Sequence, residues 1–101
     1  MSARKLPVTL ARKAKADYRQ IMLHSFQTWG EEQQIAYNSA LLRALAIIGD
    51  NPNIGRARDD LQPGYRAYTV QQHIILYRIT RRSVSVARIV HGRSDLRRAL
   101  R

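Results

Sequence analysis

The sequence predicts an α+β fold: an N-terminal strand, then an antiparallel helical hairpin packed on an antiparallel sheet with three C-terminal strands. Apolar residues recur at spacings of three and four through the first half of the chain, which is typical of amphipathic helices. From residue 64 onward they alternate with polar residues, which is typical of half-buried strands. With 101 residues, 45% of them hydrophobic, we expect residues 1–101 to form a single domain around one core.

The N-terminal strand and the first helix follow each other directly. Residues 5–10 (KLPVTL) are predicted to form a short strand, with Pro7 at an edge or at its entry. A helix is expected from Leu10 to Thr28, with Thr9 as its N-cap. Its apolar stripe comprises Ala14, Tyr18, Ile21, Met22, Ser25 and Trp29. For the aromatic and methionine positions we favour packing in or beside the core over a chemical role.

A second helix follows after one glycine. Gly30 ends the first helix, and Glu31 and Glu32 begin the second, where the helix dipole favours negative charge. Residues 49–52 (GDNP) are a strong stop signal. The main apolar stripe comprises Tyr37, Leu41, Leu45 and Ile48. Two helices joined by so short a turn are expected to pack as an antiparallel hairpin.

Three strands are expected after an irregular loop over residues 53–63. If residues 71–72 and 81–82 are two-residue hairpin turns, residue 66 pairs with 77, 68 with 75, 75 with 88, and 77 with 86. One face of the sheet then collects Arg66, Tyr68, Val70, His73, Ile75, Tyr77, Val86, Arg88 and Val90. The other face, expected to lie against the helical hairpin, collects Ala67, Thr69, Ile74, Leu76, Ala87 and Ile89. A slip of one residue would exchange the two faces.

Charge limits the kinds of partner. Eighteen Lys and Arg against seven Asp and Glu give a net charge of +11, which favours a nucleic acid, a nucleic-acid machine or an acidic protein as partner. The absence of cysteine fits a reducing cytoplasm, and three scattered histidines predict no metal site. No apolar run is long enough to cross a membrane, and the N-terminus lacks the pattern of a signal peptide. We expect no cofactor and no stable small-molecule ligand.

Several short motifs occur in an order that resembles the ParE toxins of the RelE/ParE superfamily. They are Trp29–Gly30, Asn51–Pro52 with Gly55–Arg56, Gly64–Tyr65–Arg66, the strand from His73 to Arg78, and Arg88–Ile89 followed by His91 and Arg93. The matching stretches are VTLARKAKADYRQI, WGEEQQIAYNSAL, NPNIGRARDDLQPGYRAYTVQQHIILYRI and VSVARIVHGRSDLRRAL, which cover nearly the whole chain. This resemblance implies a bacterial, cytoplasmic type II toxin that is neutralised by a ParD-like antitoxin and whose usual target is DNA gyrase.

The neighbouring branch of RelE-like toxins implies another activity, the cleavage of messenger RNA on the ribosome. Arg66 and Arg93 match two arginines of that site, and His91 or Tyr77 could act as general acid or base. The lysine-rich strand of those nucleases is absent, because residues 58–62 are RDDLQ, and residues 94–101 hold no aromatic side chain. We therefore expect a toxin that binds rather than catalyses, with the ribonuclease and a nucleic-acid-binding module as alternatives.

Two sets of residues are expected to carry binding. The target-binding set comprises Arg66, Tyr77, Arg88, His91, Arg93, Arg97 and Arg98. The antitoxin is expected to lay a helix across the helical hairpin and to continue onto the sheet, contacting Tyr18, Met22, Tyr37, Leu41, Tyr68 and Ile75. Arg78 is expected to form a salt bridge with Asp17, Asp59 or Asp60. The tail after Arg93 has few apolar side chains, so its deletion is expected to remove little core burial.

Overall fold

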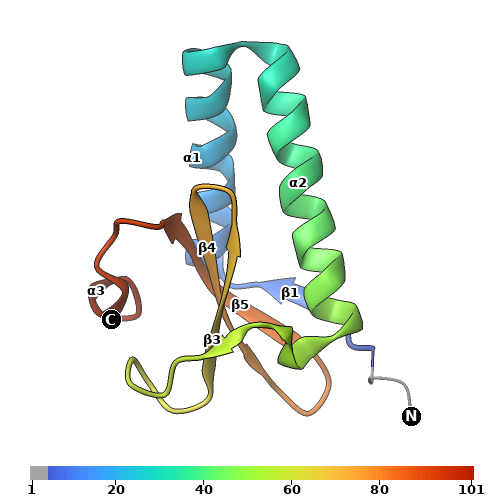
Figure 1. Ribbon diagram of the computed structural model, residues 1–101, viewed down its shortest axis with the longest axis vertical. Helices are drawn as coiled ribbons and strands as arrows, with labels where there is room; N and C mark the ends of the chain where they lie inside the picture. The colour runs from blue at the N-terminus through green and yellow to red at the C-terminus, as the bar shows by residue number, and fades with distance from the viewer. Residues whose placement is uncertain (1–4) are drawn as a thin grey trace.

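Two long helices lie against one face of a five-stranded sheet, and their common tip reaches beyond the ends of the strands (Figure 1). This computed structural model describes residues 5–101. Residues 1–4 lie outside the described part, and so does the start of the N-terminal segment that was predicted not to be a signal peptide. The elements in chain order are β1 Val8–Leu10, α1 Arg12–Trp29, α2 Glu31–Asp50, the 3₁₀ turn η1 Pro52–Ile54, β2 Arg56–Ala57, β3 Tyr65–Val70, β4 His73–Ile79, β5 Val84–His91 and α3 Leu96–Ala99. The predicted α+β class is confirmed.

α1 and α2 form the expected antiparallel hairpin. Gly30 joins them with a φ of +93°, a left-handed conformation that glycine adopts without the steric penalty of a Cβ. α1 begins at Arg12, and Ala11 occupies its N-cap position without a side-chain hydrogen bond. The prediction of Thr9 as N-cap is therefore wrong, because Thr9 still belongs to β1.

The sheet is mixed rather than wholly antiparallel. Its order is β1-β5-β4-β3-β2; β1 runs parallel to β5, and the other neighbours are antiparallel. β1 is shorter than the strand predicted over residues 5–10 and pairs only with residues 84–86. β2 and η1 lie inside the loop expected over residues 53–63, and elements of two or three residues have no periodicity from which to predict them.

Both predicted hairpin turns are confirmed. Val70 pairs with His73 across residues 71–72. The Thr80 N–H donates to the Ser83 carbonyl oxygen at 2.8 Å across residues 81–82. The predicted pairs of residues 66 with 77, 68 with 75 and 77 with 86 are also confirmed.

The predicted pair of residues 75 and 88 is wrong because β5 contains a β-bulge. Tyr77 lies opposite Val86, whereas Leu76 lies opposite Arg88, so Ala87 is an extra residue on β5. Beyond the bulge the register is shifted by one, and residue 75 faces residue 89. The shift turns Ile89 toward the core instead of Arg88.

The helices cover the face of the sheet that was predicted to be exposed. The core joins α1 and α2 to the sheet through Ala14, Ile21, Tyr37, Leu41, Ala44, Leu45, Ile48, Ile75, Tyr77, Val84, Val86 and Ile89. The alternation of side chains between the two faces was predicted correctly. The face that carries Arg66, Tyr68 and Tyr77 was wrongly expected to be exposed because of its arginine and tyrosine residues. The opposite face, called the outer face below, carries Arg56, Tyr65, Ala67, Thr69, Ile74, Leu76, Arg78, Ser85, Arg88 and Val90.

Candidate functional site

Tyr77 lies in a buried cluster beneath η1. Its hydroxyl group donates to the Pro52 carbonyl oxygen at 2.7 Å and accepts from the Gly55 N–H at 2.8 Å. The packing is so close that a Cβ on Gly55 would lie 2.7 Å from the Tyr77 ring. Burial raises the pKa of the Tyr77 hydroxyl. The expected exposure of Tyr77 is therefore wrong, because its side chain is 0% exposed and holds η1 against the sheet.

Arg66 supports the same turn. Its Nη1 donates to the Gly55 carbonyl oxygen at 2.7 Å and to the Asn53 carbonyl oxygen at 3.2 Å. Arg66 is also the cross-strand partner of Tyr77. The side chain is half-buried, so part of it stays accessible while the rest fixes the loop that enters β2.

Arg88 joins β5 to α1 and to the C-terminus. It forms a two-pronged ion pair with Asp17, with Nε–Oδ2 at 2.8 Å and Nη2–Oδ1 at 2.9 Å, and this bonding raises the pKa of Arg88. Asp17 also accepts the backbone N–H of Ile89 at 2.9 Å. Asp17 therefore pairs with Arg88, and the predicted partnership with Arg78 is wrong; Arg78 is exposed.

The C-terminal tail is docked by side chains that reach its backbone carbonyl groups. Arg88 donates to the Ala99 oxygen at 2.9 Å, Gln62 to the Leu100 oxygen at 3.1 Å, and Lys13 to the Arg101 oxygen at 3.2 Å. Further contacts are made by Arg97 to the Asp60 carbonyl oxygen at 2.7 Å and by the Asp95 carboxylate to the Arg98 N–H at 3.3 Å. The tail is thus part of the structure, and we now expect its deletion to be more disruptive than the sequence suggested.

The four residues named for an RNA-cleaving site are not brought together. Arg66 and Tyr77 lie at the η1 end of the sheet, whereas His91 ends β5 opposite His73, beside the β3–β4 turn. Four residues of strand between Arg66 and Val70 span roughly 13 Å. Arg93 follows His91 and donates its N–H to the His91 Nδ1 at 3.1 Å. The tyrosine and two arginines therefore do not converge on one phosphate-sized position.

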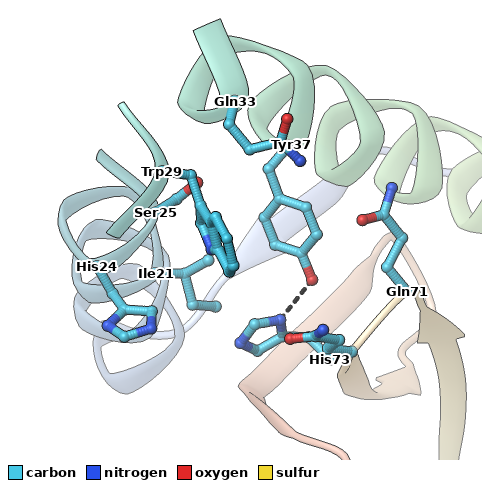
Figure 2. A pocket seen from close by; sticks show the side chains of 9 residues that line it. Ile21, His24, Ser25, Trp29, Gln33, Tyr37, Gln71 and His73 are labelled. Carbon is cyan, nitrogen blue, oxygen red and sulfur yellow. Dashed lines mark hydrogen bonds between the residues drawn. The ribbon is translucent and has the colours of Figure 1, made fainter. Parts of the chain in front are cut away.

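A cavity of about 260 Å³ lies between the tip of the helical hairpin and the β3–β4 turn (Figure 2). Figure 2 shows Trp29 and Tyr37 beside it and the hydrogen bond between the Tyr37 hydroxyl and His73 Nδ1. Burial lowers the pKa of His73, and the neighbouring His91 and His24 lower it further. The proximity of Trp29, Tyr37 and His73 was not predictable from the sequence, because they belong to three separate elements, α1, α2 and β4.

None of the six residues expected to contact an antitoxin is fully exposed, and half of them are buried. Tyr37, Leu41 and Ile75 are buried, while Tyr18, Met22 and Tyr68 are half-buried. The exposed large apolar side chains on the hairpin are instead Leu23, Phe26, Trp29, Ile35 and Leu42. We call these five residues the apolar hairpin surface. Trp29 was assigned to the apolar stripe of the first helix but is 70% exposed, and the other four were not singled out because they lie off the main stripes that face the core.

Residues 5–101 contain neither an arranged set of metal ligands nor a membrane-spanning helix. No group of three or more His, Cys, Asp or Glu side chains in this part of the chain is arranged to hold a metal ion. Within the same residues no helix is long and apolar enough to cross a membrane.

Relatives of known kind match most of the chain. Residues 8–96 match the family described as the ParE toxin of the type II toxin-antitoxin system, parDE. The chain is 34% identical over 91 residues to Toxin ParE1 of Caulobacter vibrioides, covering 90% of this chain and 94% of that protein. It is 36% identical over 101 residues to Toxin ParE1 of Mycobacterium tuberculosis, covering 99% of this chain and all of that protein.

The fold agrees with these sequence relationships. A solved structure titled "Chromosomal ParDE TA system from P. aeruginosa" superposes with a TM-score of 0.75 at 21% identity, covering 88% of this chain and 98% of that one. At that identity the likeness concerns the fold alone. The helical hairpin, the five-stranded sheet and the family match over residues 8–96 lead to one conclusion: the chain belongs to the ParE toxin family of type II toxin-antitoxin systems.

Proposed function

We propose that this chain is a growth-arresting toxin that binds DNA gyrase and that a ParD-like antitoxin keeps it inactive in the bacterial cytoplasm. In this proposal residues 1–101 act as a single domain, by binding rather than by catalysis. The observation that carries it is the separation of two surfaces: an apolar surface on the helical hairpin and an arginine-rich one on the C-terminal tail.

The apolar hairpin surface suits a protein partner. Ile35 and Leu42 are 58% and 53% exposed and lie two helical turns apart on α2, hence on the same side of that helix. Phe26 on α1 is 49% exposed, and Trp29 at the tip is 70% exposed. Large apolar side chains exposed close together on a protein surface are typical of an interaction site, and these five all lie on the two helices of one hairpin. We place the helix of the antitoxin there, in place of the internal residues named from the sequence.

The target is assigned to the opposite end of the molecule. Arg93, Arg97 and Arg98 are exposed on the tail, and Arg97 keeps 66% of its side chain accessible despite its contact with Asp60. Arginine is well suited to acidic protein surfaces because its planar fork forms paired hydrogen bonds with carboxylates. The dispersal of Arg66, Tyr77, His91 and Arg93 favours an inhibitor over a nuclease.

Co-expression tests the antitoxin surface. The chain and the small protein encoded beside its gene should elute together in size-exclusion chromatography. Replacing Phe26 and Ile35 by glutamate should separate them, whereas Ile79→Glu, an equally apolar exposed position on the sheet, should not. Co-elution of the Phe26/Ile35 variant would place the antitoxin elsewhere.

A supercoiling assay tests the target. Purified chain should inhibit supercoiling by DNA gyrase and should leave ribosome-bound messenger RNA intact. Cuts in messenger RNA at the ribosomal A site, with supercoiling unaffected, would replace this proposal by the ribonuclease.

A further inference from the structure

We propose that the outer face of the sheet, together with the docked tail, binds the phosphate backbone of double-stranded DNA. This surface is distinct from the apolar hairpin surface, and the activity does not require gyrase. The strand register brings arginines from separate strands onto one side of the sheet.

Two rows of residues cross the outer face. The first runs from Arg56 through residues 67 and 76 to Arg88, one residue from each of β2, β3, β4 and β5. The second runs from Tyr65 through Arg78 to Ser85 and Thr9. Strands lie about 4.8 Å apart, so Arg56 and Arg88 are anchored roughly 14 Å from each other, with Arg78 in the neighbouring row between them. Between Arg56 and Arg88 the row holds only the short side chain of Ala67 and the buried side chain of Leu76, so no bulky exposed side chain separates the arginines.

The tail extends this surface. Arg88 and Val90 of the outer face line a shallow hollow together with Asp95, Arg98 and Ala99 of the tail. The hydrogen bond from Arg88 to the Ala99 carbonyl oxygen fixes that arrangement. Arg98 therefore stands beside Arg88 at a defined position. Arg101 follows it, held by hydrogen bonds to Arg98 and Lys13.

The carboxylates near this surface are occupied by structural bonds. Asp17 is paired with Arg88, and Asp60 with Arg58 and Arg97. The carboxylates of Asp59 and Asp95 accept backbone N–H groups of the loop and the tail. Over the described residues 5–101, no carboxylate forms an ion pair with the arginines at positions 56, 78, 98 and 101. Four charges are therefore left to attract a polyanion.

The composition of the outer face selects duplex DNA among polyanionic partners. A protein interface needs apolar or aromatic side chains at its centre, and none of the large apolar residues that are exposed in residues 5–101 belongs to the outer face. Single-stranded nucleic acid is held by stacking on exposed aromatics, whereas Tyr65 on this face is half-buried. Arginines without stacking partners suit the regularly spaced phosphates of a duplex.

Fluorescence anisotropy with a labelled duplex of about two helical turns tests the proposal, using the refolded full-length chain without gyrase. Four phosphate contacts predict that the logarithm of the affinity falls with the logarithm of salt concentration with a slope of about −3.6. The double variant Arg56→Gln/Arg78→Gln should bring the slope to about −1.8, since each lost phosphate contact removes about 0.9. Arg56→Lys/Arg78→Lys, which keeps both charges, should retain the original slope.

The matched control is Lys15→Gln/Arg19→Gln, which removes the same charge from exposed positions of α1. Its slope should stay at the original value, and circular dichroism should show that each variant is folded. Equal losses in the two glutamine pairs would mean that only net charge matters, and would overturn the proposal. Equally tight binding of a single strand, or of polyglutamate through the same arginines, would overturn the assignment to duplex DNA.

Discussion

Replacing Tyr77 by phenylalanine tests whether this residue is part of the framework or of a binding surface. The change removes one oxygen atom and leaves the ring in place. The Gly55 N–H and the Pro52 carbonyl group, both buried, then lose their partner. An unsatisfied buried polar group destabilises by about 1–3 kcal/mol, so we expect a loss of about 3 kcal/mol for the pair. For a domain of this size that loss corresponds to a fall in Tm of roughly 12–24 °C.

Thermal unfolding followed by circular dichroism measures this change. Tyr65→Phe is the matched control, because Tyr65 is half-buried on the outer face and its hydroxyl has no hydrogen-bond partner among the described residues; its change should stay within about 0.5 kcal/mol. Raising the pH provides a second measurement. Burial raises the pKa of Tyr77 above its unfolded value of about 10, so its contribution is complete below that pH and is lost as the pH rises through the folded pKa. A Tyr77→Phe variant as stable as Tyr65→Phe would refute the structural role.

Three other changes give distinct results. Asp17→Ala leaves Arg88 and the Ile89 N–H without their acceptor and should lower the unfolding free energy, measured by urea denaturation, by about 2 kcal/mol. Asp50→Ala, at an exposed position, should leave the unfolding free energy nearly unchanged. Because the pKa of His73 is lowered in the folded chain, the unfolded chain binds more protons, so the unfolding free energy should decrease as the pH falls below about 6.5. His73→Gln should weaken this pH dependence, and an unchanged pH dependence in that variant would contradict the role of His73. Replacing Arg93, Arg97 and Arg98 of the tail by alanine should abolish growth arrest and leave the far-ultraviolet circular dichroism spectrum unchanged. The same replacement of Lys15, Arg19 and Arg43, which are exposed on the helices, should leave growth arrest intact. Continued arrest by the tail variant would locate the toxic surface elsewhere.

Regular elements were predictable because local pattern determines them. The helical hairpin follows from spacings of three and four on both sides of Gly30, and the two turns follow from breaks in an alternating pattern. The resemblance to ParE toxins was also present in the order of short motifs. These features depend on residues that are near one another in the chain.

Local pattern did not predict which face of the sheet the helices cover. It also did not predict which candidate site residues are buried or engaged in hydrogen bonds. Tyr77 is buried because a turn more than twenty residues earlier supplies hydrogen-bond partners for its hydroxyl group. Arg88 is engaged because Asp17, far away in the sequence, lies beside the edge of β5. The bulge at Ala87 shifts the register by one without any glycine to indicate it. Such long-range satisfaction of polar groups is decided by tertiary packing, which a pattern of single residues does not encode.

The parallel pairing of β1 with β5 also affects when the molecule can form. β1 is synthesised before its partner residues 84–86, with α1, α2, β2, β3 and β4 between them in the chain. Until residues 84–86 have been made, the Pro7 oxygen has no Val84 N–H from which to accept, and the Ala11 N–H has no Val86 oxygen to which to donate. The sheet must therefore close late, as is expected for contacts between distant parts of a chain. A gene copy interrupted before Val84 would encode a helical hairpin without β5, the strand that joins β1 to β4, and we expect such remnants to be harmless to the cell that carries them.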